Sequence, residues 1–578
     1  MKLLGLILLL LSACSMQAQV VPPALPKANV NIAMPTQGTK PCPTLTTGSN
    51  CVRATRPGNA ADFQAAMNAA TCGDTIVLTA GSTYRGNFRV PPSSAPCSGW
   101  VLIVSTGLRN LPAPGHRVGP PNFSQMATIS TPNESWAWGM LNGSGRWRII
   151  GVEITTSYVS TTRTVYNLIG SGVTAQGAPA TLSSQLPIAM VLDRIYIHGL
   201  PKANVTRAVD MNAQQTAIVD SYCDEIHYNQ NDSQCFGVWN APGPFLIQNN
   251  FIQAAGENFL SGGVDPTIPG LVPSDITVVG NLFQKSLTWR HLPAPYNWMI
   301  KNLLELKSSQ RVLIDGNVFQ FTWAGAQDEA LIIRSAQNGQ CPQCIVSDVT
   351  VTHNRIQHVP MGVVMSPSTG PQLIYRAQPT ARVLLQNNLL LDVDGTEWGG
   401  NGWAYQMASN TVLPIMHDII IDHNTSFCNH VHGSFLTMGD SSVTKNVQLT
   451  NLLGDYGQYG IEGSGKAPGV VALETFTTNL TYNAVALINS TGVTEHYPYP
   501  PGTFWSTLPD VGFTSYVGTD PNLEGNFKLL STSPFHDAGT DGKDIGVWDW
   551  ACLMSTTLVA GSGNYRASIG GCFRGSPQ

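Results

Sequence analysis

A short phrase recurs along this chain: alternating apolar residues, an asparagine, and a second short apolar run. The asparagines are spaced 31–37 residues apart, at Asn250, Asn281, Asn317, Asn354, Asn388 and Asn424. A period in this range is typical of a solenoid, in which each repeat is one coil that packs against its neighbours. We expect a tight turn at each asparagine, because this residue tolerates a left-handed backbone and its amide can bond the same amide in the next coil.

The composition narrows the partners that such a chain can have. Charged residues make up 11% of the chain, and the formal net charge is −5 at pH 7. The sequence has no basic stripe, so nucleic acid is not an expected partner, and the charge gives no reason to bind an anionic membrane surface. Because a solenoid grows by adding coils, the 578 residues need not divide into several cores, and we expect a monomer.

The first residues have the pattern of a targeting segment. Lys2 precedes an apolar run over residues 3–11 that is too short to span a membrane, and Leu11-Ser-Ala-Cys14 resembles the bacterial lipobox. The resemblance implies that residues 1–14 are a lipoprotein-type signal and that Cys14 carries a lipid anchor. The alternative is an ordinary secretory signal cut near Ala18. Both place the mature chain outside the cytoplasm, either anchored at the periplasm or cell surface or secreted, and no later segment is predicted to span a membrane.

The rest of the chain divides into three parts. Residues 15–41 contain widely spaced prolines and predict a tether, residues 42–550 form the solenoid domain, and residues 551–578 form a C-terminal tail closed by a disulfide. The clearest helix is 58–70, with Asn59 as its N-cap. We expect this helix to cover the open end of the first coil, where strand edges would otherwise be unpaired.

Ten cysteines fall into neighbouring pairs, which predict local disulfides in an oxidising compartment. The pairs are Cys42 with Cys51, Cys72 with Cys97, Cys223 with Cys235, Cys341 with Cys344, and Cys552 with Cys572. Cys341-Pro-Gln-Cys344 has the spacing of a redox or zinc motif, but no second such motif accompanies it, so we interpret it as a loop clip. The unpaired Cys428 is interpreted as a small buried hydrophobic residue.

Candidate functional residues lie on the strand that opens each coil, where side chains alternate between the interior and the surface. We assign the inward positions to Val209, Met211, Val238, Leu260, Leu304, Leu306, Leu331 and Ile333. The outward positions are then Asp210, Asn212, Trp239, Glu257, Ser261, Glu305, Lys307 and Arg334. Because adjacent coils lie about 5 Å apart, Lys307 and Arg334 are expected to be neighbours, with both glutamates beside them.

A column of acidic, basic and aromatic side chains suits a chain of sugar acids. Trp239 would stack on a sugar ring, and Asp210, Asn212 and Ser261 would contact the substrate. Arg334 would neutralise a uronate carboxylate and acidify its α-proton, and Lys307, next to a second cation, would remove that proton. The competing interpretation is a solvated face whose ion pairs add only modest stability.

We assign no cofactor from the sequence, and calcium is the ion that we consider. Glu257 and Glu305 would tune the charge of the cation pair or hold a calcium ion. The Asp- and Gly-rich stretch Asp520–Gly546 offers further carboxylates, but it lacks the ligand spacing of an EF-hand and is interpreted as a turn-rich cap. No metal site is assigned.

Residues 58–550 resemble the right-handed parallel β-helix proteins of the pectate-lyase-like superfamily. The resemblance rests on the asparagine repeat, on the opening Gly73–Leu78 and Tyr84–Asn87, and on the closing stretch from Asp520 to Gly546. Gly256–Gly263 and Lys301–Lys307 look like a group of secreted bacterial β-helix proteins without an assigned activity. The resemblance to the pectate-lyase-like superfamily implies an all-β fold. This fold is a single right-handed parallel β-helix with an asparagine ladder, an N-terminal helical cap and disulfide-clipped loops.

Three functions are compatible with this sequence. The first is an extracytoplasmic polysaccharide lyase that cleaves a uronate polysaccharide by β-elimination. A glycoside hydrolase is less expected, because the NTD, GHG and RIK motifs of polygalacturonases are absent. The second is a non-catalytic, lipid-anchored glycan-binding protein or adhesin that uses the same face for recognition. The third is a structural surface protein with no glycan ligand.

Overall fold

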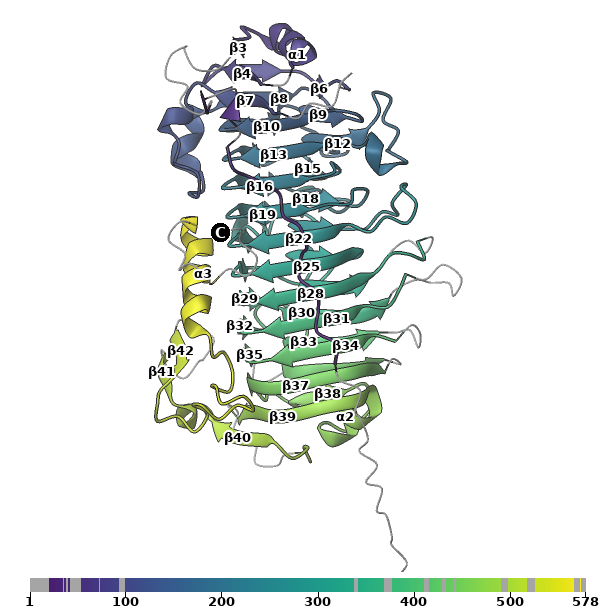
Figure 1. Ribbon diagram of the computed structural model, residues 1–578. Helices are drawn as coiled ribbons and strands as arrows, with labels where there is room; N and C mark the ends of the chain where they lie inside the picture. Colours follow the sequence, from purple (N-terminus) through teal and green to yellow (C-terminus); the bar gives the residue numbers. More distant parts are fainter. Residues whose placement is uncertain are drawn as a thin grey trace, which may run out of the picture.

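The chain folds into a right-handed parallel β-helix, as the sequence predicts (Figure 1). In this computed structural model the coils stack without interruption from the β3–β4 pair to β39 and β40. The structure describes residues 20–34, 36–37, 40–41, 53–71, 73–92, 99–336, 341–368, 377–409, 415–428, 433–440, 443–489, 497–516, 525–565 and 572.

One sheet, which we call sheet 1, contains twelve parallel strands, one from each coil. Its strands are β6 (Phe88–Val90), β9 (Trp138–Leu141), β12 (Ile169–Val173), β15 (Arg207–Asp210), β18 (Gln234–Val238), β21 (Phe259–Ser261), β24 (Leu304–Leu306), β27 (Glu329–Ser335), β30 (Met361–Ser368), β33 (Trp403–Ser409), β36 (Ser434–Asp440) and β38 (Ile461–Gly463). These are the opening strands of the coils, and the candidate residues singled out above lie on them or within two residues of their ends.

Two further stacks, sheets 2 and 3, complete each coil. Sheet 2 contains β4 (Asp74–Leu78), β7 (Val101–Ser105), β10 (Arg146–Ile150), β13 (Ala189–Asp193), β16 (Thr216–Val219), β19 (Phe245–Gln248), β22 (Ser274–Val279), β25 (Ser309–Asp315), β28 (Val346–Thr352), β31 (Ala381–Gln386) and β34 (His417–Asp422), and β3 (Arg53–Thr55) pairs with β4. Sheet 3 contains β5 (Thr83–Arg85), β8 (Ala127–Thr131), β11 (Val152–Thr156), β14 (Tyr196–His198), β17 (Tyr222–Ile226), β20 (Phe251–Ala254), β23 (Leu282–Gln284), β26 (Val318–Gln320), β29 (Arg355–Val359), β32 (Leu389–Val393), β35 (Thr425–Cys428) and β40 (Thr503–Thr507). The long strands β37 (Thr444–Asp455) and β39 (Thr477–Asn489) join the two sheets.

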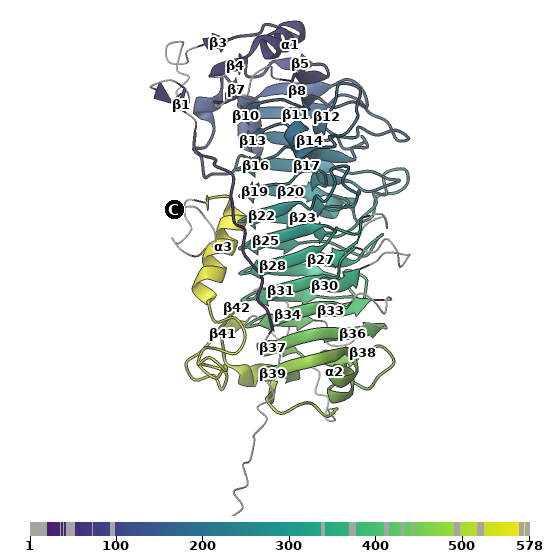
Figure 2. The same ribbon diagram turned by 45° about the vertical axis from the view of Figure 1, so that its right-hand side comes forward.

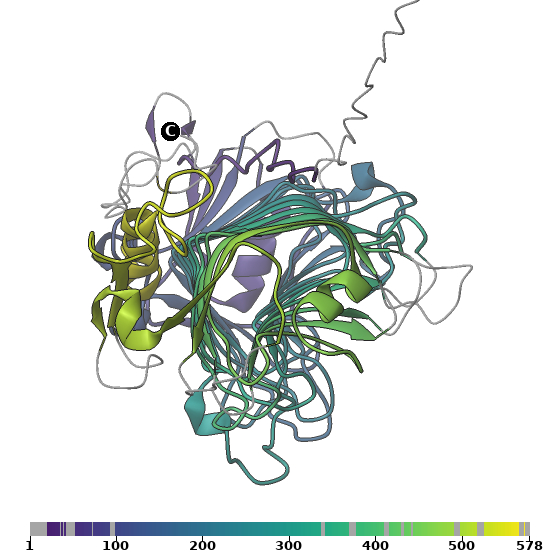
Figure 3. The same cartoon turned by 90° about the horizontal axis from the view of Figure 1, so that it is seen from below.

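A single apolar core fills the interior along the axis. Viewed along that axis, the coils superimpose and the helix α1 lies across one end (Figure 3). Helix α1 (Ala60–Ala69) packs Phe63 and Met67 onto the first coils, and the Asn59 side chain accepts a hydrogen bond from the Asp62 amide at 3.0 Å. The expected capping helix is therefore present. A shorter helix, α2 (Val470–Phe476), packs near the last coils.

The asparagine ladder is continuous and buried. Each side-chain amide donates to the side-chain oxygen of the next asparagine at 2.9–3.0 Å, from Asn250 through Asn281, Asn317, Asn354 and Asn388 to Asn424. Each such oxygen also accepts the backbone N–H of the preceding asparagine. The ladder therefore satisfies polar groups that would otherwise be costly to bury between sheets 2 and 3.

The backbone of these turns differs from the sequence-based expectation in one respect. The left-handed residue is the one before each ladder asparagine, such as His353 (φ 53°) or Asn387 (φ 56°), and not the asparagine itself. The ladder asparagine is selected because its amide must donate and accept at once. The preceding position needs only tolerance of positive φ, so it accepts Gly, Asn or His.

The described part of the proline-spaced segment, residues 20–34, lies against the β-helix (Figure 2). The backbone N–H groups of Val21, Ala24 and Lys27 donate to Asp418, Asp348 and Asp275, which belong to alternate coils. Proline-rich chain advances about 3.1 Å per residue, so three residues cover roughly two strand spacings. Val30 is buried in an apolar cluster on sheet 2. This part of the segment is thus a docked strap and not a free tether.

The C-terminal segment runs along the opposite edge of sheet 2. Helix α3 (Trp550–Ser562), which the sequence analysis did not predict, lies beside the solenoid (Figure 1). It is preceded by the antiparallel pair β41 (Phe513–Tyr516) and β42 (Gly525–Leu529). The segment follows the turn column: Thr540 donates to Asn451, Trp548 to Asn387, and Asn249 to Gly563.

Three of the five expected disulfides are present: Cys223–Cys235, Cys341–Cys344 and Cys552–Cys572. Cys428 is a buried free thiol, as expected. Among the described residues, no helix is long and apolar enough to cross a membrane.

The other two expected disulfides are not seen in the described part of the chain and stay predictions. Cys42 and its expected partner Cys51 lie outside the described residues. Cys72 and its expected partner Cys97 lie outside them as well. The same holds for Cys14, the expected site of the lipid anchor.

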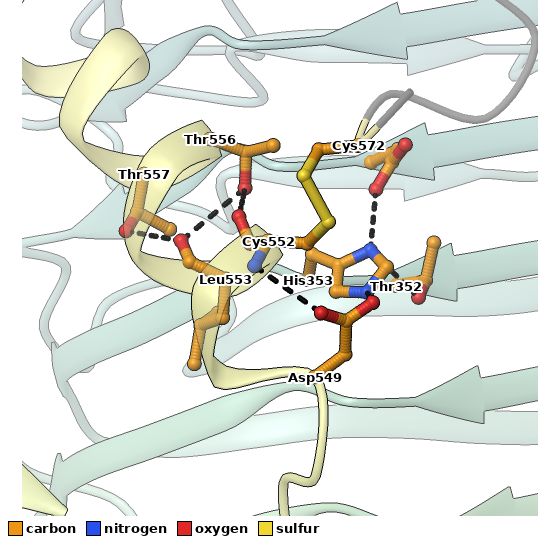
Figure 4. The surroundings of a disulfide bond; sticks show 9 residues. Thr352, His353, Asp549, Cys552, Leu553, Thr556, Thr557 and Cys572 are labelled. Atoms are coloured by element: carbon orange, nitrogen blue, oxygen red, sulfur yellow. Dashed lines mark hydrogen bonds and ion pairs between the residues drawn. A yellow bond between two sulfur atoms is a disulfide. The ribbon is translucent and has the colours of Figure 1, made fainter. Parts of the chain in front are cut away.

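A histidine joins α3 to the solenoid beside the Cys552–Cys572 disulfide (Figure 4). His353 lies between Asp315, at 3.1 Å from Nδ1, and Asp549, at 3.4 Å from Nε2. Asp549 is also the N-cap of α3 and accepts the Cys552 amide. Burial lowers the pKa of His353, but the two carboxylates outweigh it and hold the pKa above its usual value.

We therefore expect the attachment of α3 to weaken at alkaline pH. Because the folded-state pKa of His353 is raised, its stabilisation is complete below a pH of about 6.5 and is lost as the pH rises through that raised pKa. Hydrogen exchange of α3 amides at pH 6 and pH 9 measures the effect. The variant His353→Gln should exchange at both pH values as the wild type does at high pH, after correction for intrinsic rates.

Candidate functional site on the outer face of sheet 1

Two cations meet on adjacent strands of sheet 1. Leu306 pairs with Ile333 in the strand register, so Lys307 and Arg334, the next residues, are neighbours. Both contact Glu305: Lys307 Nζ lies 3.4 Å and Arg334 Nη2 lies 3.1 Å from its carboxylate oxygens. The Glu305 side chain is fully buried, whereas Lys307 and Arg334 are 16% and 23% exposed. The cations therefore stand above the carboxylate, at the surface.

A second buried carboxylate belongs to the same network. Glu257 accepts from Lys301 Nζ at 3.1 Å and from Gln234 Nε2 at 2.9 Å, and Lys301 also pairs with Asp232 at 2.8 Å. Burial raises the pKa of Glu257, but Lys301 and Lys307 outweigh it and keep the pKa below its usual value. Glu257 is thus a fixed negative charge in the turn that leads into β21.

An entirely buried lysine holds these turns in place. The Lys285 ammonium lies 2.9 Å from each of three oxygens: the Ala254 and Asn302 carbonyls and Asn258 Oδ1. It also donates to the Gly256 carbonyl. These acceptors flank Glu257 in one coil and precede Glu305 in the next. Asn302 in turn donates from its side chain to Glu305 at 3.3 Å.

The remaining predicted residues lie at the N-terminal side of this network. Trp239 stacks under the Arg207 guanidinium, 4.6 Å from the ring centroid. Asn212 accepts the backbone N–H groups of Trp239 and Asn240, so its oxygen organises the chain. Asp210 is buried in the outer row of sheet 1, and burial raises its pKa to about 7 although Arg207 opposes the shift.

Asp210 gives a stability prediction with a definite sign. Because its folded-state pKa is raised to about 7, the folded protein keeps a proton that the unfolded chain loses near pH 4, so stability falls as the pH rises from 4 to 7. The variant Asp210→Asn should remove this penalty and gain on the order of 2 kcal/mol at pH 8 relative to pH 4. Urea midpoints of both proteins at the two pH values test this, and a parallel pH dependence would contradict it.

The alternation predicted for β21 is wrong. Ser261 is in register with the core residues Val238 and Leu306, is fully buried, and donates to the Ser308 carbonyl at 3.0 Å. Leu260 is in register with Gly237 and Glu305, so it belongs to the outer row. Ser261 therefore lines the core and does not face a substrate. Apolar character misled the assignment, because this strand places a serine inward.

Several residues of the network were not singled out by the sequence analysis. Lys285, Lys301, Asp232 and Gln234 lie in or beside the turns into sheet 1, where no alternation indicates their direction. Their clustering is the sequence feature that could have indicated them. Two lysines and two acidic or amide residues occur in turns that otherwise contain few charged residues.

A hollow of about 330 Å³ adjoins this network on the side of sheet 3. Trp289, Trp298 and Trp323 contribute to its lining, with Asn229 and Arg290 at polar positions. The rings are mostly buried and form a cluster that includes Trp398. This cluster stiffens the loops that carry Lys301, because Ile300 belongs to it.

The two glutamates do not fit a calcium site. Each of their four oxygens already accepts from a donor: Lys301 and Gln234 at Glu257, and Arg334, Lys307 and Asn302 at Glu305. Calcium takes six or more oxygen ligands, whereas these carboxylates are neutralised by protein cations. Among the described residues, one group has metal-ligating geometry, His536 with Asp537 and Asp544 in the C-terminal cap.

Comparisons with known proteins give similarities of fold at low identity. No family model and no curated protein matches this chain. Among solved structures, an alginate lyase from Paenibacillus sp. str. FPU-7 is 13% identical with a TM-score of 0.25, over 72% of this chain and 98% of that one. A family 28 exopolygalacturonase of Yersinia enterocolitica is 10% identical with a TM-score of 0.37, over 79% and 78%. Pectate lyase Pel9A is 12% identical with a TM-score of 0.28, over 86% and 97%. These values assign no activity, so the function is argued from the site.

Proposed function

We propose that this protein acts outside the cytoplasm on an acidic polysaccharide, which it binds along the outer face of sheet 1 and cleaves by β-elimination. The observation that carries the proposal is the Lys307–Arg334 pair above the buried Glu305. Two cations share one carboxylate there, so the exposed end of the cluster keeps a net positive charge. A uronate carboxylate would supply the missing negative charge.

The geometry suits the first step of an elimination. Arg334 offers a planar fork of donors to the uronate carboxylate and withdraws its charge, which acidifies the adjacent C–H. Lys307, one strand away, accepts that proton in its neutral amine form, the C–O bond at the neighbouring carbon breaks as the double bond forms, and the departing glycosidic oxygen takes a proton from water. Asp210 is buried three strand spacings from Glu305, roughly 14 Å away, so it takes no part in this step.

The disulfides support the proposed location. Three are formed in the described residues, and such bonds persist in oxidising compartments. Anchoring through a lipid on Cys14 remains part of the proposal.

A panel of polysaccharides tests this function. The full chain is incubated with pectate, alginate, xylan and cellulose, with and without calcium, and new sugar ends are measured. We expect release from an acidic polymer only, with an ultraviolet-absorbing unsaturated end. Release of saturated ends would show that the protein is a hydrolase and not a lyase. No release from any polymer would show that the proposed cleavage is wrong.

A second candidate is a glycan-binding protein without catalysis. It is favoured by one observation: all four oxygens of Glu257 and Glu305 are engaged by donors, so neither carboxylate is free to act as acid or base. This candidate predicts binding of an acidic polymer in the same panel, measured by affinity electrophoresis, without release of sugar ends.

A further inference from the structure

Far from Lys307, the same face of sheet 1 carries a second hollow, of about 300 Å³. Its lining includes Arg89 of β6, Trp136 and Tyr166 from loops that lead into β9 and β12, and Asn167. The loops around β12 project at the upper right of Figure 1. None of these residues belongs to the charged network around Glu305.

The strand register places the hollow on the face that carries the network. Arg89 pairs with Gly139 and Gly139 with Gly170, while Ile169, the residue before Gly170, pairs with Val209, the residue before Asp210. The row continues from Asp210 through Gly237 and Leu260 to Glu305. From β12 to β24 there are four strand spacings, roughly 19 Å.

Glycines in this row create the floor of the hollow. A Cβ atom at Gly139 would lie 2.8 Å from the Trp136 ring, and one at Gly170 would lie 1.5 Å from it. The ring therefore rests directly on the backbone of β9 and β12, which any side chain at these positions would prevent. An indole laid along a sheet in this way offers an apolar surface of the kind that stacks on sugar rings.

The polar groups of the hollow favour an anionic ligand. Arg89 lies 5.7 Å from the Trp136 centroid and donates to the Ala175 carbonyl at 2.9 Å. Among the described residues it has no carboxylate partner. Glu134 also lines the hollow, but Arg163 binds it at 2.8 Å and neutralises it. Tyr166 is 66% exposed and makes no ring contact within the described part of the chain.

A cationic and aromatic link joins the hollow to the network. Asn167 accepts from the Arg207 guanidinium at 3.2 Å, and Arg207 stacks on Trp239. The order along the face is thus Arg89 and Trp136, then Arg207 and Trp239, then Lys307 and Arg334. Cations and aromatic rings alternate at intervals that an extended chain of sugar acids would meet repeatedly.

We propose that the hollow over β9 and β12 is a distal subsite that binds a uronate residue of the same polysaccharide chain whose cleaved bond lies at Lys307. This inference rests on the proposed function and extends it. Arg89 binds the carboxylate, and Trp136 and Tyr166 stack on the ring. The substrate is then a long, repeatedly charged polymer, because one chain must span roughly 19 Å between the two positions.

The test compares the binding of octamers by the full chain and by the double variant Arg89→Gln/Tyr166→Ala. The probes are octamers of galacturonate and of mannuronate, with an uncharged glucose octamer for comparison, and the readout is the Kd from calorimetry. We expect the double variant to raise the Kd of the preferred uronate octamer about tenfold or more. Arg85→Gln, at an exposed arginine of β5 in the same coil, should leave the Kd unchanged.

The outcomes separate the subsite from the proposed function. An unchanged Kd in the double variant, whose thermal midpoint confirms its fold, would overturn the subsite while the proposed function stands. If neither uronate octamer binds the wild type, both fall. A Kd raised as expected, in a protein that releases no sugar ends, would support the subsite and leave the chain a glycan-binding protein.

Discussion

The variant Lys285→Met is expected to lose about 3–5 kcal/mol of stability, because it leaves four buried carbonyl and amide oxygens without their donor. Three of the oxygens lie 2.9 Å from the ammonium and come from three turn positions, Ala254, Asn258 and Asn302. Methionine fills a similar volume, so the loss reports the missing hydrogen bonds and not a cavity. Urea unfolding followed by circular dichroism measures the shift in midpoint.

The matched control is Lys445→Met, at an exposed lysine of β37, for which we expect a change within about 0.5 kcal/mol. Equal midpoints for Lys285→Met and the wild type would show that water or backbone movement satisfies the acceptors. Lys285→Met should also affect the candidate site, because Lys285 holds the turn around Gly256 and Asn258, and this turn positions Glu257. We expect Lys285→Met to weaken polysaccharide binding even under conditions where the chain remains folded.

The repeat was readable from sequence because one residue type performs the same task in every coil. Asn281 and Asn317 must each donate to one neighbour and accept from the other, and only a primary amide does both in that space. Because of this requirement, asparagine recurs at regular intervals in the sequence. The residue before each ladder asparagine needs only to adopt a positive φ. Gly280, His353 and Asn387 all do so, and no single residue type therefore recurs at this position.

The two segments that run along sheet 2 were harder to predict, since their contacts are distant in sequence. Nothing in the sequence of Val21–Lys27 indicates that its backbone N–H groups donate to distant aspartates. The most distant of these is Asp418, which accepts from Val21. Helix α3 contains Thr556 and Thr557, which have weak helix propensity. Its caps were readable: Asp549 accepts the Cys552 amide, and Gly563 ends the helix in a left-handed conformation.

In the candidate site, the alternation of inward and outward side chains along a strand placed some residues correctly from sequence and others wrongly. Regular strands such as β24 and β27 allowed Lys307 and Arg334 to be placed as neighbours from the sequence, and the register places them so. The turns did not allow this, and neither did β21, which places a serine inward and a leucine outward. Ser261 was assigned to the wrong face, and Lys301 and Lys285, which hold the site together, lie where the chain has no period at all.

The variants Arg334→Lys and Lys307→Met provide the second large effect, a fall of about 100-fold or more in cleavage of the preferred acidic polymer. Lysine at position 334 keeps the charge but loses the fork of donors that a carboxylate requires. Methionine at position 307 removes the proton acceptor and so affects the chemical step more than binding. We therefore expect Arg334→Lys to raise KM and lower kcat, whereas Lys307→Met lowers kcat with a smaller change in KM.

The control for these variants is Arg382→Lys, at an arginine that binds Asp348 through two contacts of 2.7 Å on sheet 2, away from the outer face of sheet 1. It makes the same chemical change in another carboxylate pair and should leave cleavage unchanged. Because Glu305 is buried beneath both cations, each variant is also compared with its Glu305→Gln double variant, which removes the buried carboxylate that the substituted residue no longer binds as before. Activity restored in the double variants would show that Lys307 and Arg334 balance charge for the fold. Activity still absent from a stable protein would assign them to the reaction.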